Sequence, residues 1–262
     1  MRTIHAERGR RSPKTGQSPF FVGYKKHTIS ALAQIDGGWR AIPLYSLARP
    51  AGKADVEMLK PLLNYIQRRL VDHLPLHIVL GDKGYISAER ARFLRECWNV
   101  ALVAAPRADM HPPDGTTSDG CPLCPLGEPL VWKDYDASDG RLIYQGAKTA
   151  CMLCPLSGGC AKQFEFSADA HETFWGMIPS HSPLSRRLLR QFRPLTESGF
   201  YTAKHCFRLK DFFINSLELA QTLCVMSDIV ELLKIIGREG AYSPRQLKKS
   251  VAHEIIQPEL WD

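Results

Sequence analysis

Residues 81–85 (GDKGY) hold one acid, Asp82, between two glycines. They directly follow the apolar run at residues 77–80 (HIVL), which predicts a short strand. A strand that ends in a short acid holds its carboxylate at a sheet edge, where a metal ion or a phosphate can reach it. The alternative interpretation is that Asp82 only caps the turn that the glycines make.

A second pattern lies downstream, where Glu197 follows Arg193 by four residues and Lys204 follows Glu197 by seven. On a helix that turns about 100° per residue, these three side chains share one face. Such a face is ordinarily a solvated row of ion pairs. The alternative is a carboxylate that meets a metal ion while the cations around it hold phosphates. Three further arginines come just before this pattern: Arg186, Arg187 and Arg190.

Cysteines supply the third candidate site. Five of the eight lie close together in sequence, in two CxxC pairs and one single position: Cys121, Cys124, Cys151, Cys154 and Cys160. Two CxxC pairs at this separation are typical of a tetrahedral structural zinc site. We also expect zinc because a small, loop-rich segment has too little apolar surface to order itself. The alternatives are disulfides, which a reducing compartment disfavours, and thiols that merely pack.

A redox role for the CxxC pairs is disfavoured, because neither pair follows a strand and opens a helix. The remaining thiols, Cys97, Cys206 and Cys224, fall within helical apolar patterns. We expect these three to be buried and inert.

The elements that must position these residues follow from periodicity. Residues 20–33 and 39–47 predict two strands of a hairpin, joined by the turn at residues 36–38 (DGG). Residues 55–73 carry apolar side chains at steps of three or four, which predicts an amphipathic helix opened by Asp55.

A helix over residues 87–97 is expected next, with Ser87 as its cap, and then a short strand within residues 100–105. The order strand, strand, helix, strand, helix, strand predicts an α/β layer with a mixed sheet. Ligand chemistry is then expected at the C-terminal ends of its parallel strands. From residue 182 onward the pattern is helical, and Pro194 predicts that a helix begins there with Arg193 at its cap.

Composition sets the class of protein. With 262 residues and 44% hydrophobic content the chain can bury a substantial core. The net charge is +7, and residues 1–26 hold seven lysines or arginines against one acid, which suits a polyanionic partner such as DNA. No apolar run reaches membrane-span length and no secretory signal is present, so we expect a cytoplasmic protein without a membrane partner.

Taken together, these blocks resemble the DDE transposases of bacterial insertion sequences. The matching residues are the hairpin residues 20–27 (FFVGYKKH), Asp55, GDKGY, and the spacing Arg193-x3-Glu197-x6-Lys204. The cysteine-rich segment, with Cys124-Pro-Leu-Gly and then Cys151-x2-Cys154-Pro, is similar to an insertion that one branch of that family carries. The resemblance covers residues 18–236.

The resemblance implies a ribonuclease-H-like mixed sheet with flanking helices, interrupted by a zinc-ribbon-like insertion. It implies DNA transposition by metal-dependent cleavage and strand transfer, with Asp82 and Glu197 as catalytic carboxylates on a two-Mg²⁺ site. The implied partner is DNA at the transposon ends, bound by a homodimer. The residues expected to contact DNA are Arg193, Lys204, Arg186, Arg187, Arg190, Lys25 and Lys26.

Two departures from the family pattern stand out. The first catalytic acid should come from a strand upstream of the hairpin, and residues 1–19 contain no Asp and no expected strand. We therefore expect an N-terminally truncated transposase that is inactive alone, or else a non-catalytic, zinc-stabilised DNA-binding remnant. In the second departure, Arg190 stands where the family has tyrosine.

The expected organisation is a basic arm at 1–19, a catalytic domain at 20–105 and 182–237, a cysteine-rich insertion at 106–174, and a tail at 238–262.

Overall fold

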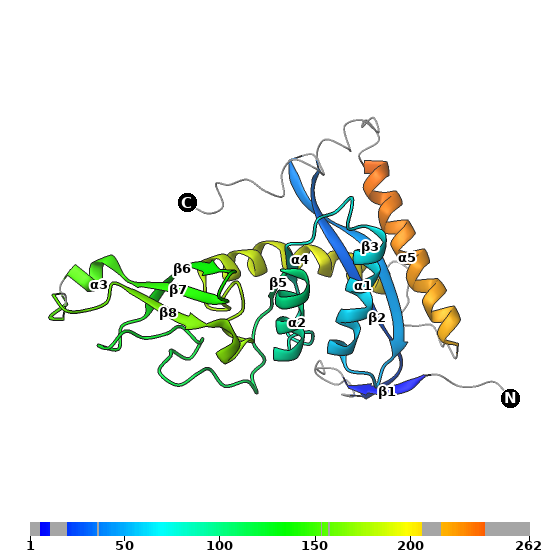
Figure 1. Cartoon of the computed structure of the whole chain (residues 1–262). Helices are drawn as coiled ribbons and strands as arrows, with labels where there is room; N and C mark the ends of the chain where they lie inside the picture. Colours follow the sequence, from blue (N-terminus) through cyan, green and yellow to red (C-terminus); the bar gives the residue numbers. More distant parts are fainter. Residues whose placement is uncertain are drawn as a thin grey trace. The chain divides into compact units, whose positions relative to one another are not determined.

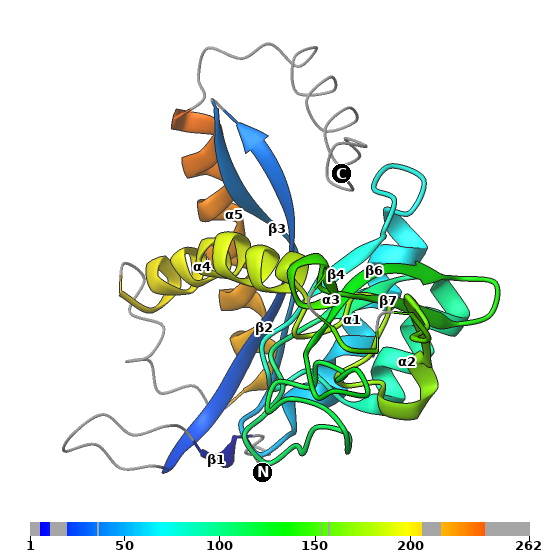
Figure 2. The ribbon, with the colours of Figure 1, turned by 90° about the vertical axis from the view of Figure 1, so that its left-hand side faces the viewer.

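The computed structural model describes residues 6–10, 20–35, 37–152, 154–156, 158–205 and 216–238. Over these residues the chain is a mixed α/β protein with three small sheets and five α-helices (Figures 1 and 2). It divides into two units. The first combines Met1–Val71 with Pro194–Asp262, and the second is Asp72–Arg193.

A long antiparallel hairpin is the centre of the first unit. It pairs β2 (Phe20–Ile35) with β3 (Gly38–Pro50), and the two strands meet where Ile35 faces Gly38. Gly37 turns the chain with φ +72°, a left-handed conformation that glycine adopts without strain. The predicted hairpin is confirmed, while Asp36 of the expected turn lies outside the described residues.

Helices cover both faces of this hairpin (Figure 1). On one face α1 (Leu59–Arg69) packs through a stack of Tyr65 on Tyr45, with ring centroids 3.8 Å apart. On the other face α5 (Leu217–Arg238) buries Ala220 and Cys224 against Ala48 of β3. Residues 45 and 48 point to opposite faces because side chains alternate along a strand.

The predicted helix over residues 55–73 is shorter than expected. It opens as the 3-10 turn η1 (Asp55–Met58) and continues as α1, which ends at Arg69. Asp55 does not cap it, because the capping position is Ala54 and no side chain bonds there. Asp55 instead forms an ion pair with Lys25 of β2, at 2.8 Å.

The expectation of no strand before residue 20 is wrong. β1 (Glu7–Arg10) pairs antiparallel with the start of β2, from Glu7 opposite Gly23 to Arg10 opposite Phe20. Its sequence, ERGR, has no apolar alternation. A strand of this kind forms because a partner strand supplies the hydrogen bonds, which local sequence does not reveal.

In the second unit, β4 (Ile78–Leu80) and β5 (Ala101–Val103) run parallel, joined by α2 (Ala88–Trp98). This is the predicted strand–helix–strand crossover. The Ser87 side chain accepts a hydrogen bond from the Arg90 N–H, as expected of the cap, and Asn99 ends the helix in a left-handed conformation.

The expected single mixed sheet is not formed. β2–β3 and β4–β5 belong to separate sheets. Joining them would need a strand that pairs with both β2 and β4, and the described part of the chain contains none.

Residues 106–174 fold around a third sheet, which corrects the expectation of a loop-rich segment. β6 (Leu130–Asp136), β7 (Arg141–Gly146) and β8 (Gln163–Ser167) pair antiparallel, with α3 (Lys148–Met152) between β7 and β8 and the 3-10 turn η2 (Ala168–His171) after them. The core under this sheet consists of Leu130, Leu142, Tyr144, Phe174 and Trp175. The segment therefore buries an apolar core of its own.

The prediction that a helix begins at Pro194 is wrong. α4 runs from Pro183 to His205 with Pro194 inside it, so Arg193 is a helical residue and not a cap. The first half of α4 buries Leu184, Leu188 and Leu189 against the core of β5, and that packing forms the helix ahead of the proline. The boundary between the two units falls at Pro194, where the helix lacks one backbone hydrogen bond.

The three cysteines outside the cysteine-rich segment do not share one environment. Cys224 is buried as expected, Cys97 is exposed, and Cys206 lies outside the described residues. Cys97 lies in the last turn of α2, whose buried residues are Ala91 and Leu94.

Candidate functional site

Asp82 follows β4 directly, at the carboxyl end of the parallel pair. The strand pairing ends with the Gly81 N–H bonded to the Val103 carbonyl, at 2.9 Å. Asp82 then starts a turn, because its carbonyl accepts from the Tyr85 N–H at 2.9 Å and its Oδ1 accepts from the Lys83 N–H at 2.8 Å. The acid thus caps a turn and stands at the end of a strand, which both interpretations from the sequence require.

The glycine before Asp82 is not there for an unusual backbone conformation. Gly81 does not have the left-handed φ that several other described glycines have. A Cβ at this position would make ordinary contacts with Tyr85, Leu102 and Ala104, at 3.6–3.8 Å. Neither the backbone conformation nor the packing therefore requires glycine at this position.

Arg193 of α4 reaches Asp82. Its Nη2 lies 3.2 Å from Asp82 Oδ1, and the two side chains are 46% and 53% exposed. The packing of Leu184 and Leu188 against Ala101 and Val103 holds this stretch of α4 along the β4–β5 pair. The structure therefore brings together two residues from sequence blocks that lie far apart.

The other arginines of α4 are exposed on the same unit. Arg186 forms an ion pair with Asp119, while Arg187 and Arg190 are exposed. Partial burial raises the pKa of Asp119, but the Thr117 hydroxyl and the Arg186 charge outweigh this and leave the pKa lowered. Three arginines on two turns of one helix give it a positive surface.

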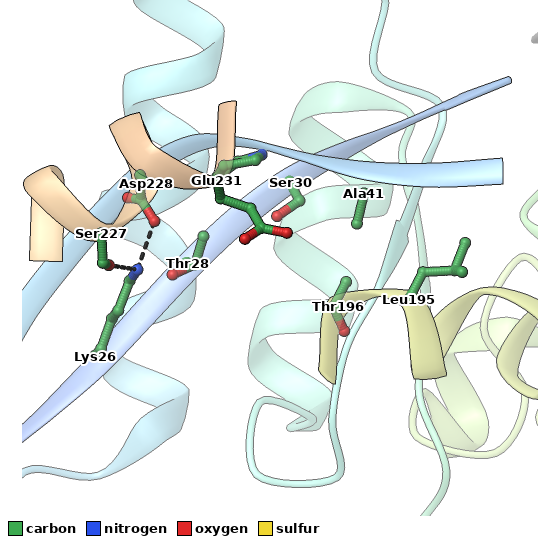
Figure 3. A pocket seen from close by; sticks show the side chains of 10 residues that line it. Lys26, Thr28, Ser30, Ala41, Leu195, Thr196, Ser227, Asp228 and Glu231 are labelled. Atoms are coloured by element: carbon green, nitrogen blue, oxygen red, sulfur yellow. Dashed lines mark hydrogen bonds and ion pairs between the residues drawn. The ribbon is translucent and has the colours of Figure 1, made fainter. Parts of the chain in front are cut away.

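The lysines of β2 are held within the first unit. Lys25 donates to Asp55 and to the Lys53 carbonyl, at 2.8 and 3.2 Å. Lys26 donates to Ser227 Oγ at 2.6 Å and to Asp228 Oδ1 at 2.5 Å, both on α5 (Figure 3). The Lys26 side chain is 15% exposed, so its charge serves first to fix α5 on the hairpin.

Glu197 and Lys204 belong to the part of α4 assigned to the first unit, whereas Asp82 and Arg193 belong to the second. Glu197 is exposed. The Lys204 backbone is helical, and its side chain lies outside the described residues.

Both CxxC pairs stand at the same end of the β6–β7 hairpin. Leu130, which begins β6, pairs with Gly146, which ends β7. Cys121 Sγ donates to the Leu130 carbonyl at 3.0 Å, and a Cβ on Gly146 would overlap Cys151 Sγ. The pairing of the two strands thus brings one cysteine of each pair to one sheet end.

A tight turn follows the first CxxC pair, and another spans the second. The Gly127 N–H bonds to the Cys124 carbonyl at 2.8 Å, and the Cys154 N–H bonds to the Cys151 carbonyl at 3.3 Å. All five cysteines are free thiols, and burial raises the pKa of Cys121. Within the described residues, no three Cys, His, Asp or Glu side chains are grouped closely enough to hold a metal ion.

Sequence reasoning missed the polar residues that tie elements together. Arg95 of α2 binds Glu172 through two hydrogen bonds and also pairs with Asp169 of η2. The Gln221 side chain accepts from the Ala48 N–H and donates to the Ser46 carbonyl, both at 2.8 Å, and so satisfies the edge of β3. No local pattern marks either residue, because each partner is far away in sequence.

No protein-family model, curated protein or solved structure matches this chain. None of the described helices combines the length and the apolarity that a bilayer crossing requires.

Proposed function

We propose that this chain is part of a DDE-type DNA transposase, with Asp82 as one of its metal-binding carboxylates. The observation that carries the proposal is the ion pair between Arg193 and Asp82. The family resemblance assigns GDKGY and the Arg-x3-Glu-x6-Lys block to one active site. An exposed contact between residues of the two blocks is what a shared site requires, and it supports the proposal.

The order of elements supports a ribonuclease-H-like arrangement. A long hairpin, a helix, and a parallel strand–helix–strand unit follow one another, with Asp82 at the carboxyl end of the first parallel strand. In such a sheet the strand that carries the first acid lies between β2 and β4. In the described residues the hairpin and the parallel pair lie in separate sheets.

Asp82 is suited to hold a divalent cation, because its carboxylate is half exposed and rigidly placed. The Lys83 N–H orients the carboxylate. Arg193 is exposed beside Asp82, so it can leave this acid and bind a DNA phosphate instead. When bound, Mg²⁺ would polarise the phosphodiester and stabilise the leaving oxygen. The family resemblance assigns Glu197 the role of a second carboxylate.

Arg187 and Arg190 have the proposed role of positioning DNA through its backbone. Both are exposed on α4, and Arg193 lies further along the same helix beside Asp82. Contacts to phosphates release counterions, so binding should tolerate different sequences and weaken steeply as salt is raised.

Duplex binding measured by fluorescence anisotropy at several salt concentrations tests the proposal. Arg187→Glu with Arg190→Glu should weaken binding at least tenfold and flatten its salt dependence. The matched control is Arg68→Glu with Arg69→Glu, at the end of α1, which should change binding far less. Affinity that is independent of salt, or equal losses in the two double variants, would contradict DNA binding by α4.

The second candidate is a zinc-stabilised DNA-binding remnant without catalysis. It is favoured by the absence, among the described residues, of a cluster of three acids at Asp82. It is also favoured by the position of Cys121 and Cys151 at one end of the β6–β7 hairpin. In this candidate, four thiolates drawn from the five cysteines would bind Zn²⁺.

Metal analysis of protein from zinc-supplemented cells tests this candidate. We expect close to one zinc per chain, lost in Cys121→Ser and in Cys154→Ser but retained in Cys97→Ser. Protein that contains no zinc would rule out the metal site, and it would leave the DNA-binding proposal to the anisotropy experiment.

A further inference from the structure

The ion pair between Asp82 and Arg193 opposes the binding of either residue's proposed ligand. Arg193 Nη2 lies 3.2 Å from Asp82 Oδ1, and both residues belong to the second unit. A divalent cation on the Asp82 carboxylate would be close to the guanidinium, and like charges repel. A DNA phosphate competes with the carboxylate for the same guanidinium N–H groups. Each ligand must therefore break the pair before it binds.

This ion pair is easily broken. The two side chains are 46% and 53% exposed, so water screens their attraction. Its loss changes an equilibrium constant by at most about fivefold. The Asp82 carboxylate keeps its orientation without Arg193, because it also accepts a hydrogen bond from the Lys83 N–H at 2.8 Å. Arg193 can therefore change its partner while the acid stays in place.

We propose that DNA and a divalent cation bind cooperatively to this chain, with Arg193 as the residue that couples them. The inference rests on the proposed function. Either ligand alone bears the whole cost of breaking the ion pair. When both bind, the pair is broken only once, so the second ligand binds without that cost. In the absence of DNA, Arg193 masks Asp82, and a duplex that draws Arg193 away unmasks it.

The ion pair limits the size of this coupling. Linkage is reciprocal, so DNA should strengthen cation binding by the same factor by which the cation strengthens DNA binding. The part that passes through Arg193 is at most about fivefold. Direct attraction between a bound cation and a nearby phosphate adds to it without Arg193. The test must therefore compare chains with and without this arginine.

The first measurement follows Mn²⁺ binding to the full chain in the absence of DNA. Paramagnetic Mn²⁺ at Asp82 would broaden the nuclear magnetic resonance signals of the Lys83 and Gly84 amides. These signals should broaden at two- to fivefold lower Mn²⁺ concentration in Arg193→Gln than in the wild type, on the order of the strength of an exposed ion pair. Asp82→Asn should abolish the effect. Arg190→Gln removes the same charge from an exposed position on α4 and should change the broadening far less.

The second measurement follows duplex affinity by fluorescence anisotropy at constant ionic strength, with and without Mn²⁺. Without metal, Asp82→Asn should tighten DNA binding by about two- to fivefold, because Arg193 no longer has to leave an acid. The same substitution should have a smaller effect in an Arg193→Gln background. Addition of Mn²⁺ should favour DNA binding more in the wild type than in either single variant, since only the wild type has the pair to break.

Three results would overturn the coupling even if α4 binds DNA. They are equal broadening in the wild type and Arg193→Gln, equal effects of Asp82→Asn in the two backgrounds, and an equal response of all chains to Mn²⁺. A chain that binds no DNA would contradict the proposed function together with the coupling, and the broadening would still decide whether Arg193 masks Asp82. Both substituted side chains are about half exposed, so circular dichroism should show unchanged folding.

Discussion

At the scale of single residues, Asp82 combines a structural and a chemical position. Its Oδ1 orients the turn after β4 by accepting from the Lys83 N–H, and the same carboxylate is paired with Arg193. Neither contact buries the acid. A carboxylate held in this way contributes little to folding and remains available to a ligand.

Replacing Arg193 by Gln should therefore change stability little. Both partners of the ion pair are about half exposed, so we expect the free energy of unfolding in urea to fall by less than about 1 kcal/mol. DNA affinity should fall more clearly, because a phosphate contact would be lost. A large loss of stability with unchanged DNA binding would show that Arg193 is structural.

His27 predicts a dependence of stability on pH. It is buried in β2, and burial lowers its pKa, although the Asp55 carboxylate partly opposes this effect. The unfolded chain takes up a proton at this position near pH 6.5, whereas the folded chain resists it. The stability that the neutral histidine provides is complete above that pH and is lost as the pH falls through it.

Urea unfolding at pH 7.5 and pH 5.5 measures this effect. The difference in unfolding free energy between the two conditions should be smaller in His27→Gln than in the wild type. His73→Gln, at an exposed position, is the control and should retain the wild-type difference. An undiminished pH dependence in His27→Gln would contradict the assignment.

At the scale of elements, buried polar contacts tie the second unit together. The Glu172 side chain is 1% exposed and the Arg95 side chain is 9% exposed. Arg95 donates two hydrogen bonds to Glu172, which join α2 to the turn after η2. Burial raises the pKa of Glu172, which the Arg95 bonds and charge counteract. Such a pair is costly to break on one side only.

Arg95→Met should accordingly destabilise the protein by about 3 kcal/mol, because it leaves a buried carboxylate without its cation. The control is Arg92→Met on the same helix, where the arginine is half exposed and more distant from Glu172. Thermal unfolding compares the two. Equal effects would mean that Arg95 acts through its alkyl chain and not through its charge.

At the scale of the whole molecule, the proposed metal site is incomplete in the described residues. Among those residues no group of three His, Cys, Asp or Glu side chains includes Asp82, and the β2–β3 hairpin and the β4–β5 pair lie in separate sheets. Residues that act as a catalytic unit lose most of the rate when one member is absent.

We therefore expect no Mg²⁺-dependent nicking of DNA by these 262 residues alone. Asp82→Asn and Glu197→Gln should leave this result unchanged, in an assay of supercoiled plasmid with Mg²⁺ or Mn²⁺. Nicking by the wild type that either substitution removes would mean that the site is complete. Asp55 or Asp36 would then have to be tested as the third acid.

The sequence by itself determined the elements whose signals are local. Periodicity and turn residues predicted the β2–β3 hairpin and the β4–α2–β5 unit, and Ser87 predicted its helix cap, because each depends on residues a few positions apart. The position of Asp82 at a strand end follows from the same signals.

Tertiary structure decided what depends on distant partners. β1 exists because β2 pairs with it, α4 passes through Pro194 because its first half packs on β5, and Asp55 binds Lys25 instead of capping a helix. The contact of Arg193 with Asp82 belongs to the same group. Hydrogen bonds, ion pairs and packing across the fold outweigh local preferences of a few tenths of a kcal/mol to about 1 kcal/mol per residue.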